Sequence, residues 1–583
     1  MRALGAVGLA LLLASGAGAQ RAARTGERPN VVMIVVDDLN AAVGFLSEEP
    51  GNPLLTLYPD PAVRAQVQSV LTPNLDRLAA SGVPFARAYA PSPICAPSRA
   101  AVMTGVRPHA SRFDDNGDGL WRQNPVLAEA RTLPEHLRRH GYFTAGLGKV
   151  FHRWQVELDA RGQVAVDGPD VARSWEVWIN AAVGAGRVEA WSPWSVESTE
   201  LRMGVAEGTL DDMKDVQNAT AVADLLQFGA ATFDDAIYDI ERTVTLPSDR
   251  PFFLALGLYR PHTPLTVPRE LLDLFDPADL ALSDSLLAVF ADDTADLAPG
   301  GRARIFRGNA STEPGPTATF YAHADALDPD GGRVAAWTDL VRHYLAAVAL
   351  ADRAVGRVMD ALDAGPYADD TIVVLWGDHG WHLGEKTWFG KTTLWEESAH
   401  APLIVRTPEA VAPGVLRRQP VSLMDLYPTI AAAAGLPIPP HVQGADLGPA
   451  LIQPQAPVGA VALTTMGRDD HALRTRRHRY IRYGDLPLDS ELYDEDRDPD
   501  ERDNLADDDL RITLNTALDA ALNRAPAPVR TPPDRPLATR LGHPAPNPTA
   551  DGIVLDLALE TASEVGIEVQ TVLGQSVWRQ RLG

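Results

Sequence analysis

The run Val31–Val36, "VVMIVV", constrains the fold of this 583-residue chain more than any other stretch. It is apolar and mostly β-branched, as expected of a strand that is buried on both of its faces. Strands of this kind belong to parallel sheets that helices cover on both sides. Two carboxylates, Asp37 and Asp38, follow the run directly. Burying them is costly unless a cation or hydrogen bonds compensate their charge.

Two further segments show the same arrangement of an apolar strand followed by polar residues. The strand expected at 371–377 leads into Asp378 and His379, and the strand expected within 251–265 ends near His262. Residues 339–364 carry apolar side chains at helical spacing. Because strand and helix patterns alternate, we predict an α/β fold with a mostly parallel sheet sandwiched by helices. Ligands bind at the carboxyl ends of the strands in such sheets.

The first residues predict export of the protein. Arg2 precedes an apolar run over residues 3–14, and small residues lead to a cleavage site before Gln20. We therefore interpret residues 1–19 as a signal peptide rather than as an uncleaved anchor, since the run is too short for a comfortable membrane span. No other long apolar stretch is present in the sequence. We expect a mature protein without a membrane span that is periplasmic, on the cell surface or secreted.

The formal net charge of −25 bears on the partners of the chain. A strongly acidic protein repels nucleic acid and anionic membrane surfaces. We therefore expect no nucleic-acid partner. Any anionic substrate has to be captured by a local basic pocket.

Cys95 is the only cysteine in the chain. Cysteines of exported proteins usually pair, so an unpaired one indicates an intermolecular bridge or a reactive group, with a buried structural thiol as the alternative. Cys95 stands in the sequence Cys-Ala-Pro-Ser-Arg, residues 95–99, and Thr104-Gly105 follows shortly after.

This C-x-P-S-R and T-G pattern resembles the activation signature of type I sulfatases in the alkaline-phosphatase-like superfamily. The resemblance extends over roughly residues 28–510 and is to the iduronate-2-sulfatase-like branch, through "GKVFH", "YRPHTP", "LWGDHGWHLGEKTWFGK", "TLWEE" and "ELYDEDRDPDERDNLA". It implies an alkaline-phosphatase-like fold and hydrolysis of the sulfate ester of a sulfated sugar or polysaccharide. It also implies that a formylglycine-generating or equivalent maturase converts Cys95 to formylglycine, an aldehyde.

The implied chemistry explains the residue types. A hydrated aldehyde carries two hydroxyls on one carbon. One attacks sulfur and the alcohol leaves; the other then loses its proton, and re-forming the carbonyl expels sulfate. A serine would perform the first step only.

The resemblance also implies one Ca²⁺ per chain at the site. Oxygen-rich ligation favours Ca²⁺ or Mg²⁺ over zinc. Many sulfatases have Asn at the position of His379, but the iduronate-like branch shares the histidine. The implied ligands are Asp37, Asp38, the modified Cys95, Asp378 and His379.

The remaining site residues are also implied by the family. Arg99 would fix the nucleophile, a role that Lys would fill poorly. Lys149 and His152 would contact the hydrate and the sulfate, with His152 as the base of the elimination step. His262 and Lys391 would bind the sulfate, and either could protonate the leaving alcohol. Together with a divalent cation, these residues would make the site net positive in an acidic protein.

Other segments carry weaker signals. Asp114–Asn116 lack the full calcium-loop pattern, so we interpret them as a substrate-side loop. Arg468 and His471 would line a sugar subsite or belong to a solvated face, and we expect a solvated face for the acidic residues 490–508. We expect core positions rather than carbohydrate platforms for four tryptophans: Trp376, Trp381, Trp388 and Trp395.

The pattern along the chain divides it into segments. We predict a catalytic domain over 28–405, a smaller C-terminal α+β subdomain over 406–524, a Pro-rich linker over 525–540 and a small β tail over 541–583. The tail resembles the C-terminal sorting domain of the type IX secretion system. Such domains usually continue for another strand pair.

Two alternative functions are also compatible with the sequence. Phosphonate and phosphodiester hydrolases of the same superfamily share the C-x-P-S-R pattern. A protein that binds sulfated glycans without catalysis is the other alternative, although a binder needs no nucleophile.

Overall fold

A computed structural model describes residues 28–523 and the backbone of two later strands, β23 (Val565–Gln570) and β24 (Ser576–Leu582). The predicted signal peptide and the predicted linker lie outside the described residues, as does the rest of the tail. Short gaps interrupt the described range at 118–119, 154–155, 159–163, 180–185, 200, 236–239, 308–315, 409, 411, 460 and 486.

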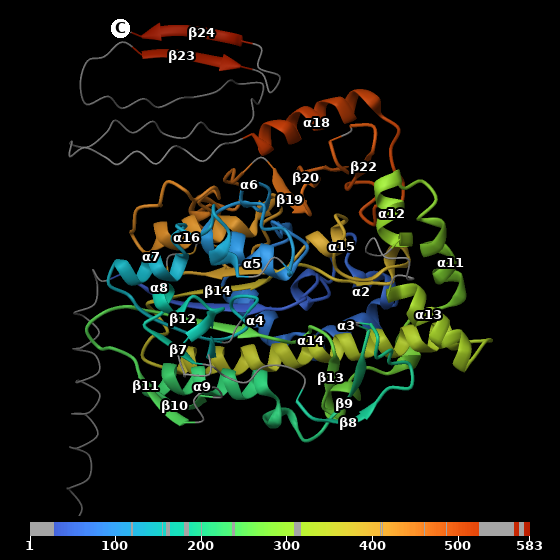
Figure 1. Ribbon diagram of the computed structural model, residues 1–583, viewed down its shortest axis with the longest axis horizontal. Coiled ribbons are helices and arrows are strands. Elements are labelled where there is room, and N and C mark those ends of the chain that lie inside the picture. The colour runs from blue at the N-terminus through green and yellow to red at the C-terminus, as the bar shows by residue number, and fades with distance from the viewer. Residues whose placement is uncertain are drawn as a thin grey trace, which may run out of the picture.

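A seven-stranded sheet forms the centre of the fold (Figure 1). Five neighbouring strands are parallel, and two more follow at one edge, each pairing antiparallel with its neighbour, so that one strand of the sheet runs against the other six. In spatial order the strands are β2 (Val83–Phe85), β17 (Leu403–Arg406), β14 (Thr371–Gly377), β1 (Asn30–Val36), β12 (Phe252–Leu258), β4 (Phe143–Gly148) and β7 (Val177–Ile179). The predicted mostly parallel sheet is confirmed.

β1 lies between β12 and β14, and every one of its residues is buried. Because side chains alternate along a strand, Val32, Ile34 and Val36 belong to the apolar core on one side of the sheet. The intervening residues, beginning with Val31, belong to the core on the other side. This two-sided burial is the reason that the run contains no polar residue.

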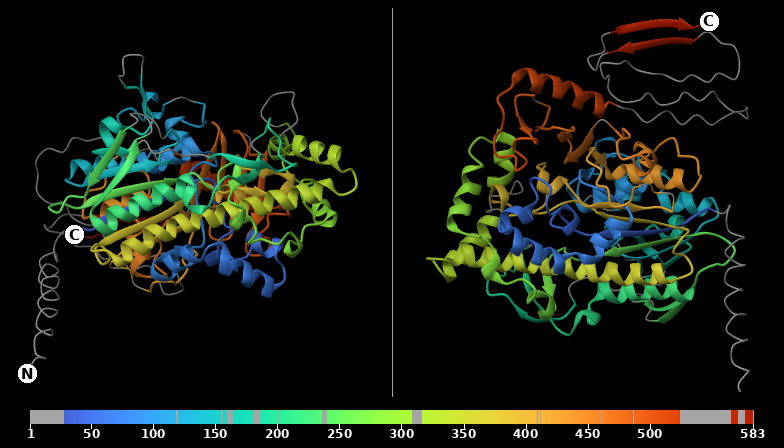
Figure 2. Two further views of the ribbon diagram at one scale, coloured as in Figure 1. Left: turned by 90° about the horizontal axis from the view of Figure 1, so that it is seen from below. Right: turned by 180° about the vertical axis from the view of Figure 1, so that it is seen from behind.

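The first side of the sheet is covered by α14 (Gly332–Ala364) together with α9 (Lys214–Phe228), α3 (Pro61–Leu71) and α4 (Pro73–Ser81). α14 runs along the length of the sheet, and α9 packs beside it (Figures 1 and 2). The helix predicted at 339–364 forms the greater part of α14.

The second side of the sheet is covered by α5 (Cys95–Thr104), α7 (Leu133–Arg139) and α16 (Leu426–Ala433). All residues of α5 are buried. Gly105 ends this helix with a φ of 72° and donates its N–H to the carbonyl of Ala101. A left-handed residue at this point favours glycine, which gives a physical reason for the glycine of the T-G pair.

A second, antiparallel sheet forms the C-terminal part of the described chain. Its strands are β19 (Ala462–Met466), β20 (Asp470–Arg474), β21 (His478–Arg482) and β22 (Ser490–Asp494), and α18 (Asp508–Leu522) packs against it. The boundary at residues 405 and 406 stays a prediction. Residues of α16 share an apolar core with the central sheet.

The solvated face predicted for residues 490–508 is wrong for residues 490–495 and for Glu501. β22 is buried throughout, and Glu491 and Glu501 are fully buried. Their carboxylates accept hydrogen bonds from groups far away in the sequence, among them Trp395 Nε1 and Arg479 Nε. These distant partners compensate the burial of charge, and a local charge pattern does not reveal them.

The remaining elements connect these layers. The other strands are β3 (Ala88–Tyr89), β5 (Val156–Leu158), β6 (Val164–Asp167), β8 (Val188–Trp191), β9 (Met203–Ala206), β10 (Ala230–Asp235), β11 (Ile240–Thr245), β13 (Leu265–Val267), β15 (His382–Leu383), β16 (Phe389–Gly390) and β18 (Val421–Ser422). The other α-helices are α2 (Pro53–Leu57), α6 (Pro108–Ser111), α8 (Val171–Ser174), α10 (Arg269–Leu272), α11 (Asp284–Asp292), α12 (Pro299–Arg307), α13 (Pro316–Leu327), α15 (Glu396–Ala399) and α17 (Gly448–Ile452). Short 3₁₀ turns are η1 (Gly44–Leu46), η2 (Trp121–Gln123), η3 (Leu210–Asp212), η4 (Pro277–Asp279), η5 (Glu385–Thr387) and η6 (Leu423–Asp425).

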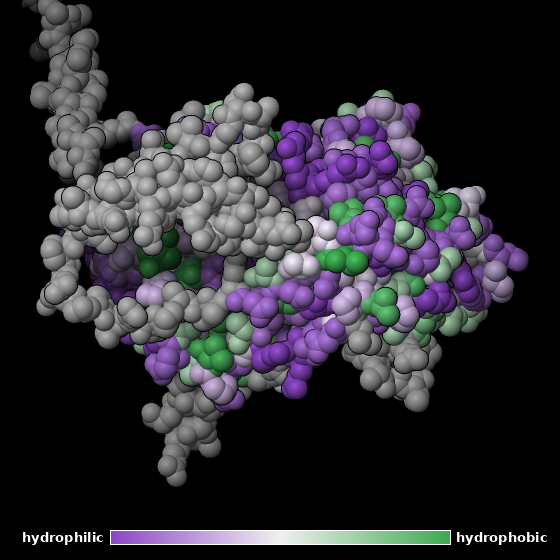
Figure 3. All heavy atoms as spheres, turned by 90° about the horizontal axis from the view of Figure 1, so that it is seen from above, coloured by the Kyte–Doolittle hydropathy of each residue, from purple (hydrophilic) through white to green (hydrophobic). Residues whose placement is uncertain are grey.

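Hydrophilic residues cover most of the described part of the face seen in Figure 3, and hydrophobic residues are scattered among them in small groups. Scattered hydrophobic residues are normal on a protein surface. Among the described residues, no helix is both long enough and apolar enough to span a membrane.

We predict that Ile34→Ala destabilises the protein by about 2–5 kcal/mol, because it leaves a cavity at the centre of a sheet that is packed on both sides. The midpoint of urea unfolding measures the change. Ile512→Ala in α18 makes the same chemical change at a side chain that is 66% exposed. A similar loss of stability in both variants would contradict the central role of β1.

Candidate active site

The carboxyl ends of four neighbouring strands bring the polar residues together. β1 is followed by Asp37 and Asp38, β14 by Asp378 and His379, and β4 by Lys149, while His262 lies in the loop after β12. α5 contributes its first residue and Arg99, and Lys391 follows β16. The residues predicted from the sequence that meet here are Asp37, Asp38, Cys95, Arg99, Lys149, His152, His262, Asp378, His379 and Lys391.

Arg99 joins the ends of β1 and β14. Its Nη2 donates to Asp37 Oδ1 at 2.8 Å, and its Nε donates to Asp378 Oδ2 at 2.8 Å. Arg99 also donates to the main-chain carbonyls of Lys149 and Val150 at the end of β4. All three charged side chains are fully buried. One planar guanidinium therefore holds three strand ends in a fixed arrangement.

Lys149 lies on the other side of Asp37. Its ammonium is hydrogen-bonded to Asp37 Oδ2 and lies 5.2 Å from the centre of the Tyr259 ring. Gly257 of β12 lets the main chain of Lys149 pack closely against this strand, because a Cβ at position 257 would lie 2.0 Å from the carbonyl carbon of Lys149. Burial would raise the pKa of Asp37, but Lys149 and Arg99 outweigh it and hold this pKa well below its usual range. Asp37 is therefore a carboxylate.

Asp38 adopts a left-handed backbone conformation, with a φ of 58°. Such a conformation is uncommon outside glycine and often marks a functional site. Lys391 Nζ donates to Asp38 Oδ1 at 2.7 Å, and His262 Nε2 lies 3.9 Å from Oδ2. Oδ2 is buried and accepts no hydrogen bond from the described protein atoms. This oxygen is available to a ligand.

The Cys95 sulfur lies at the centre of the cluster. Lys391 Nζ is 3.1 Å from it, and His379 Nε2 is 3.2 Å from it. Burial raises the pKa of the Cys95 thiol, but the charges of Lys391, Lys149 and His379 outweigh this effect and hold the pKa well below its usual range. The amino end of α5 adds a favourable dipole. The surroundings of residue 95 therefore stabilise a negative charge there.

Asp378 and His379 respond to burial in different ways. Burial raises the pKa of Asp378 to about 6, against the opposing charges of Arg99 and His379. Burial would lower the pKa of His379, but the charges of Asp378 and Cys95 raise it to about 9. The backbone N–H groups of Asp38 and His379 both donate to Asp378 Oδ1. These bonds fix the carboxylate against the end of β1.

The cluster fits a divalent cation. Three overlapping groups have potential ligand atoms within 4.8 Å of one another: Asp38, Cys95 and His379; Asp37, Cys95 and Asp378; and Asp37, Asp38 and His262. Each group contains at least one carboxylate and two of the three contain two, and the buried Oδ2 of Asp38 accepts no hydrogen bond from the described protein atoms. An oxygen-rich set of this kind suits Ca²⁺ or Mg²⁺.

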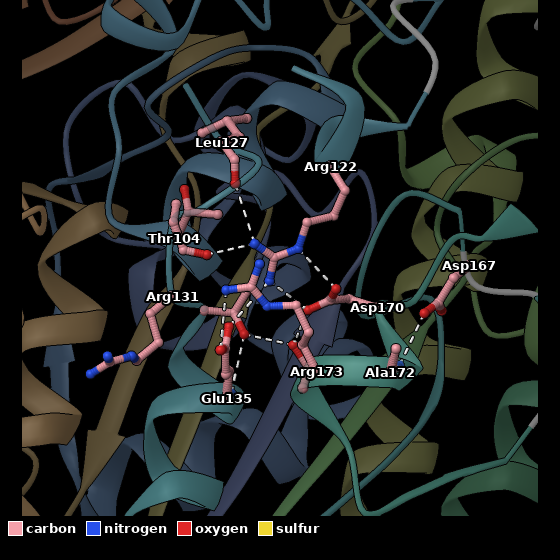
Figure 4. Close-up of polar contacts among 12 residues, drawn as sticks. Thr104, Arg122, Leu127, Arg131, Glu135, Asp167, Asp170, Ala172 and Arg173 are labelled. Carbon is pink, nitrogen blue, oxygen red and sulfur yellow. Dashed lines mark hydrogen bonds and ion pairs between the residues drawn. The ribbon is translucent and has the colours of Figure 1, made fainter. Parts of the chain in front are cut away.

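His152 lies beside the sulfur, and a hydrogen bond from it also lowers the pKa of Cys95. The preceding residue, Phe151, stacks on Trp121 with ring centres 5.5 Å apart. The guanidinium carbon of Arg122 lies 4.1 Å from the centre of the Trp121 ring. Arg122 also donates two hydrogen bonds to Asp170 (Figure 4). This arrangement holds the segment that carries His152 in place.

The weaker predictions have mixed outcomes. Asn116 Oδ1 accepts a hydrogen bond from the N–H of Ala96, so this loop lies beside residue 95, and its role toward substrate stays a prediction. Arg468 is exposed, but His471 is buried and hydrogen-bonded to Thr465, so the two do not form one solvated face. The core positions predicted for the four tryptophans are confirmed.

Two residues that hold the site were not predicted. The hydroxyl of Tyr344, in α14, donates to the carbonyl of Asp38 at 2.8 Å. Asp215, in α9, accepts from the N–H groups of Tyr259 and Arg260 and so fixes the loop that carries His262. Tyr344 lies within an ordinary helical pattern and Asp215 lies in no motif, so no sequence signal identified them.

The amino-acid sequence is similar to those of known sulfatases. The profile of the sulfatase family matches residues 29–436, and one for the C-terminal part of N-sulphoglucosamine sulphohydrolase matches residues 384–527. A sulfatase from Formosa agariphila is 32% identical over 485 residues, which is 82% of each chain. Human iduronate 2-sulfatase is 27% identical over 474 residues, covering 75% of this chain and 74% of the human one.

Solved structures show the same fold. A phosphonate monoester hydrolase from Silicibacter pomeroyi superposes with a TM-score of 0.60 at 22% identity, covering 86% of this chain and 96% of that one. A protein solved with its substrate D-glucosamine-2-N,6-O-disulfate superposes with a TM-score of 0.57 at 20% identity, covering 85% and 97%. These similarities confirm the predicted alkaline-phosphatase-like α/β fold.

We predict that Arg99→Met lowers the free energy of unfolding by about 3–5 kcal/mol, because it leaves Asp37 and Asp378 buried without their shared cation. Urea unfolding measures the loss. Arg250→Met removes the cation of a partly exposed pair with Glu176, and such pairs contribute about 1 kcal/mol or less. An Arg99→Met variant as stable as the wild type would show that the guanidinium does not compensate the carboxylates.

Proposed function

The chain belongs to the sulfatase family and is a sulfuric ester hydrolase, and from this premise we propose that it hydrolyses the sulfate ester of a sulfated sugar or polysaccharide with residue 95 as the nucleophile. One observation supports this assignment above the others. Cys95 lies buried beside the Lys391 ammonium and the His379 ring and among the carboxylates at two strand ends. Such surroundings suit a nucleophile that attacks an anionic ester.

In the proposal, Cys95 is converted to formylglycine, and its sulfur in this structure marks the place of the aldehyde hydrate. The described residues offer Cys95 no disulfide partner, because it is the only cysteine of the chain. One hydroxyl of the hydrate would attack sulfur while the sulfur–oxygen bond to the alcohol breaks and the alcohol takes up a proton. The second hydroxyl would then lose its proton, re-form the carbonyl and release sulfate.

We assign the metal to the carboxylate cluster. Asp37, Asp38, Asp378 and His379, with the modified residue 95, would hold one Ca²⁺. When bound, the ion supplies positive charge beside the nucleophile and the sulfate oxygens. The Oδ2 of Asp38, which accepts no hydrogen bond from the described protein atoms, supports this assignment.

The basic residues of the site would have different roles in the reaction. Arg99 holds the carboxylates, and Lys149 and His152 would contact the hydrate and the sulfate, with His152 taking the proton in the elimination step. Lys391 is buried and touches the nucleophile, which supports a role in binding the charge of the ester. The side chain of His262 is 18% exposed, and its Nε2 lies 3.9 Å from Oδ2 of the fully buried Asp38. That position supports His262 as the acid that protonates the departing alcohol.

The names of relatives support a carbohydrate substrate. Matching curated proteins include an N-acetylglucosamine-6-O-sulfatase from Bacteroides thetaiotaomicron and an ulvan-active sulfatase from Formosa agariphila. Phosphonate monoester hydrolysis is the second candidate function, because enzymes of that activity share the fold with a TM-score of 0.60. The family match and the identity to sulfatases over most of the chain favour the sulfate ester.

The proposal extends to the route of the protein. We infer export after removal of residues 1–19, maturation of Cys95 by a formylglycine-generating or equivalent enzyme, and passage through a type IX secretion machinery that recognises the tail. Catalytic, C-terminal, linker and tail segments would follow the predicted boundaries. An exported enzyme of this kind would meet sulfated polysaccharides outside the cytoplasm.

We predict that the matured protein releases sulfate from at least one member of a panel of 2-, 4- and 6-sulfated saccharides, with a kcat/KM far above that for a phenylphosphonate monoester. Ion chromatography of free sulfate and phenol release measure the two rates. Cys95→Ser is the control variant, since it should stop after one alcohol is released per chain. A preference for the phosphonate ester would favour the second candidate function.

We predict that substitutions of His262 and Lys391 affect a sulfated sugar and an aryl sulfate differently. His262→Ala should reduce turnover of a sulfated sugar by about 10²- to 10⁴-fold. It should affect 4-nitrophenyl sulfate much less, because a phenolate leaves without acid help. Lys391→Ala should impair both substrates alike, because both carry the same sulfate group. Equal losses for His262→Ala with a selective loss for Lys391→Ala would reverse the two roles.

A further inference from the structure

The loop that carries Lys391 has an unusual backbone. It connects β15, β16 and α15, and it contains left-handed residues at Gly384, Lys386, Thr387, Gly390 and Thr392. Three of these are not glycine, and such residues keep this conformation only where the surrounding structure determines it. The position of the Lys391 ammonium therefore depends on whatever holds this loop.

The first part of the loop is held through Lys386. Its ammonium is fully buried and donates to Asp293 Oδ1 at 2.8 Å and to the main-chain carbonyl of Glu501. A buried ammonium without partners is costly, so these acceptors fix the side chain. Lys386 thereby ties the loop to a residue that is distant in the sequence.

The second part of the loop is held by the same distant residue. Glu501 Oε2 accepts a hydrogen bond from the N–H of Glu396 at 2.8 Å, at the first turn of α15. Glu501 Oε1 accepts from Arg479 Nε. Glu501 is itself fully buried and left-handed, with a φ of 53°. Its main chain and its side chain therefore hold the chain on both sides of Lys391.

The C-terminal sheet fixes Glu501 in turn. Arg479, on β21, binds Glu501 and Glu396 and also donates to the carbonyl of Leu394 at 3.2 Å. Glu491, on β22, accepts from Trp395 Nε1 at 2.7 Å. The residues just after Lys391 are thus attached to two strands that contribute nothing directly to the cluster around residue 95.

We propose that Glu501 is a positioning residue, which holds the Lys391 ammonium against residue 95 and Asp38 by tying both sides of its loop to the C-terminal sheet. This inference rests on the proposed role of Lys391 in binding the sulfate group. Lys391 Nζ lies 2.7 Å from Asp38 Oδ1 and 3.1 Å from the Cys95 sulfur. A shift of this loop would change both distances.

A double-mutant cycle on the matured protein tests the inference, with 4-nitrophenyl sulfate as substrate. Glu501→Gln keeps the shape of the side chain and removes the charge that pairs with Arg479. A misplacement of about 1 Å can cost about 10²-fold in rate, so we expect kcat/KM to fall by about 10- to 100-fold. In a Lys391→Ala background, we expect the same change to reduce kcat/KM by less than about 2-fold, because the group that it positions is gone.

Asp494→Asn is the matched control. Asp494 also lies on the C-terminal sheet and pairs with Arg477, but it has no contact with the loop that carries Lys391 among the described hydrogen bonds and ion pairs. It should retain wild-type kcat/KM. Thermal unfolding of each variant reports whether it folds. If Glu501→Gln does not fold, Glu501→Asp replaces it, since Asp tolerates a left-handed backbone and is too short to keep both contacts.

The outcomes distinguish the proposed role of Lys391 from the proposed role of Glu501. Full activity of Lys391→Ala would overturn the proposed role of Lys391 and this inference with it. A damaged Lys391→Ala enzyme that loses a further 10-fold on Glu501→Gln would overturn the inference alone, as would wild-type activity of the folded Glu501 variant. An equal loss in Asp494→Asn would show general damage to the sheet and would also overturn the inference.

Discussion

The buried bridge between Arg99 and the carboxylates of Asp37 and Asp378 is the interaction on which the rest of the structure depends. Three carboxylates follow the ends of two neighbouring buried strands. Without nearby cations, the cost of burying them would oppose the packing of these strand ends. One guanidinium connects these strand ends and also binds the main chain after β4. Arg99 lies one helical turn after Cys95 in α5, so the same bridge sets the amino end of this helix against the carboxylates. Charge compensation and placement of the nucleophile are therefore one feature.

The remaining cations reach the cluster from separate layers of the fold. Lys149 comes from the end of β4 and His262 from the loop after β12, and the latter is held by Asp215 of the helical layer. Lys391 comes from a loop outside the central sheet that the C-terminal sheet holds through Glu501. This division explains how a chain with a net charge of −25 surrounds one position with positive charge. The fold brings these basic residues together at one point, although they are far apart in the sequence.

Much of the central fold was predictable because local patterns determine it. The run Val31–Val36 has a composition that only two-sided burial explains, and the pairs Asp37-Asp38 and Asp378-His379 mark strand ends by position. The contacts that fix the site were less predictable, because they join residues far apart in the sequence. Residues 490–508 have the composition of a solvated segment, yet Glu491 and Glu501 are buried, since Trp395 and Arg479 supply the donors. Tyr344 holds the backbone of Asp38 from within an ordinary amphipathic helix. A local sequence pattern does not indicate a hydrogen bond between residues so far apart in the chain.

The central claim is that residue 95 acts as a formylglycine. Mass spectrometry of the peptide that contains residue 95 tests it most directly, on protein exported by its native host and assayed for sulfate release in the same preparation. We predict a peptide lighter than the cysteine form, as the free aldehyde, in a proportion that follows the specific activity across preparations. An unmodified thiol throughout a preparation that hydrolyses sulfate esters at its full rate would contradict the account.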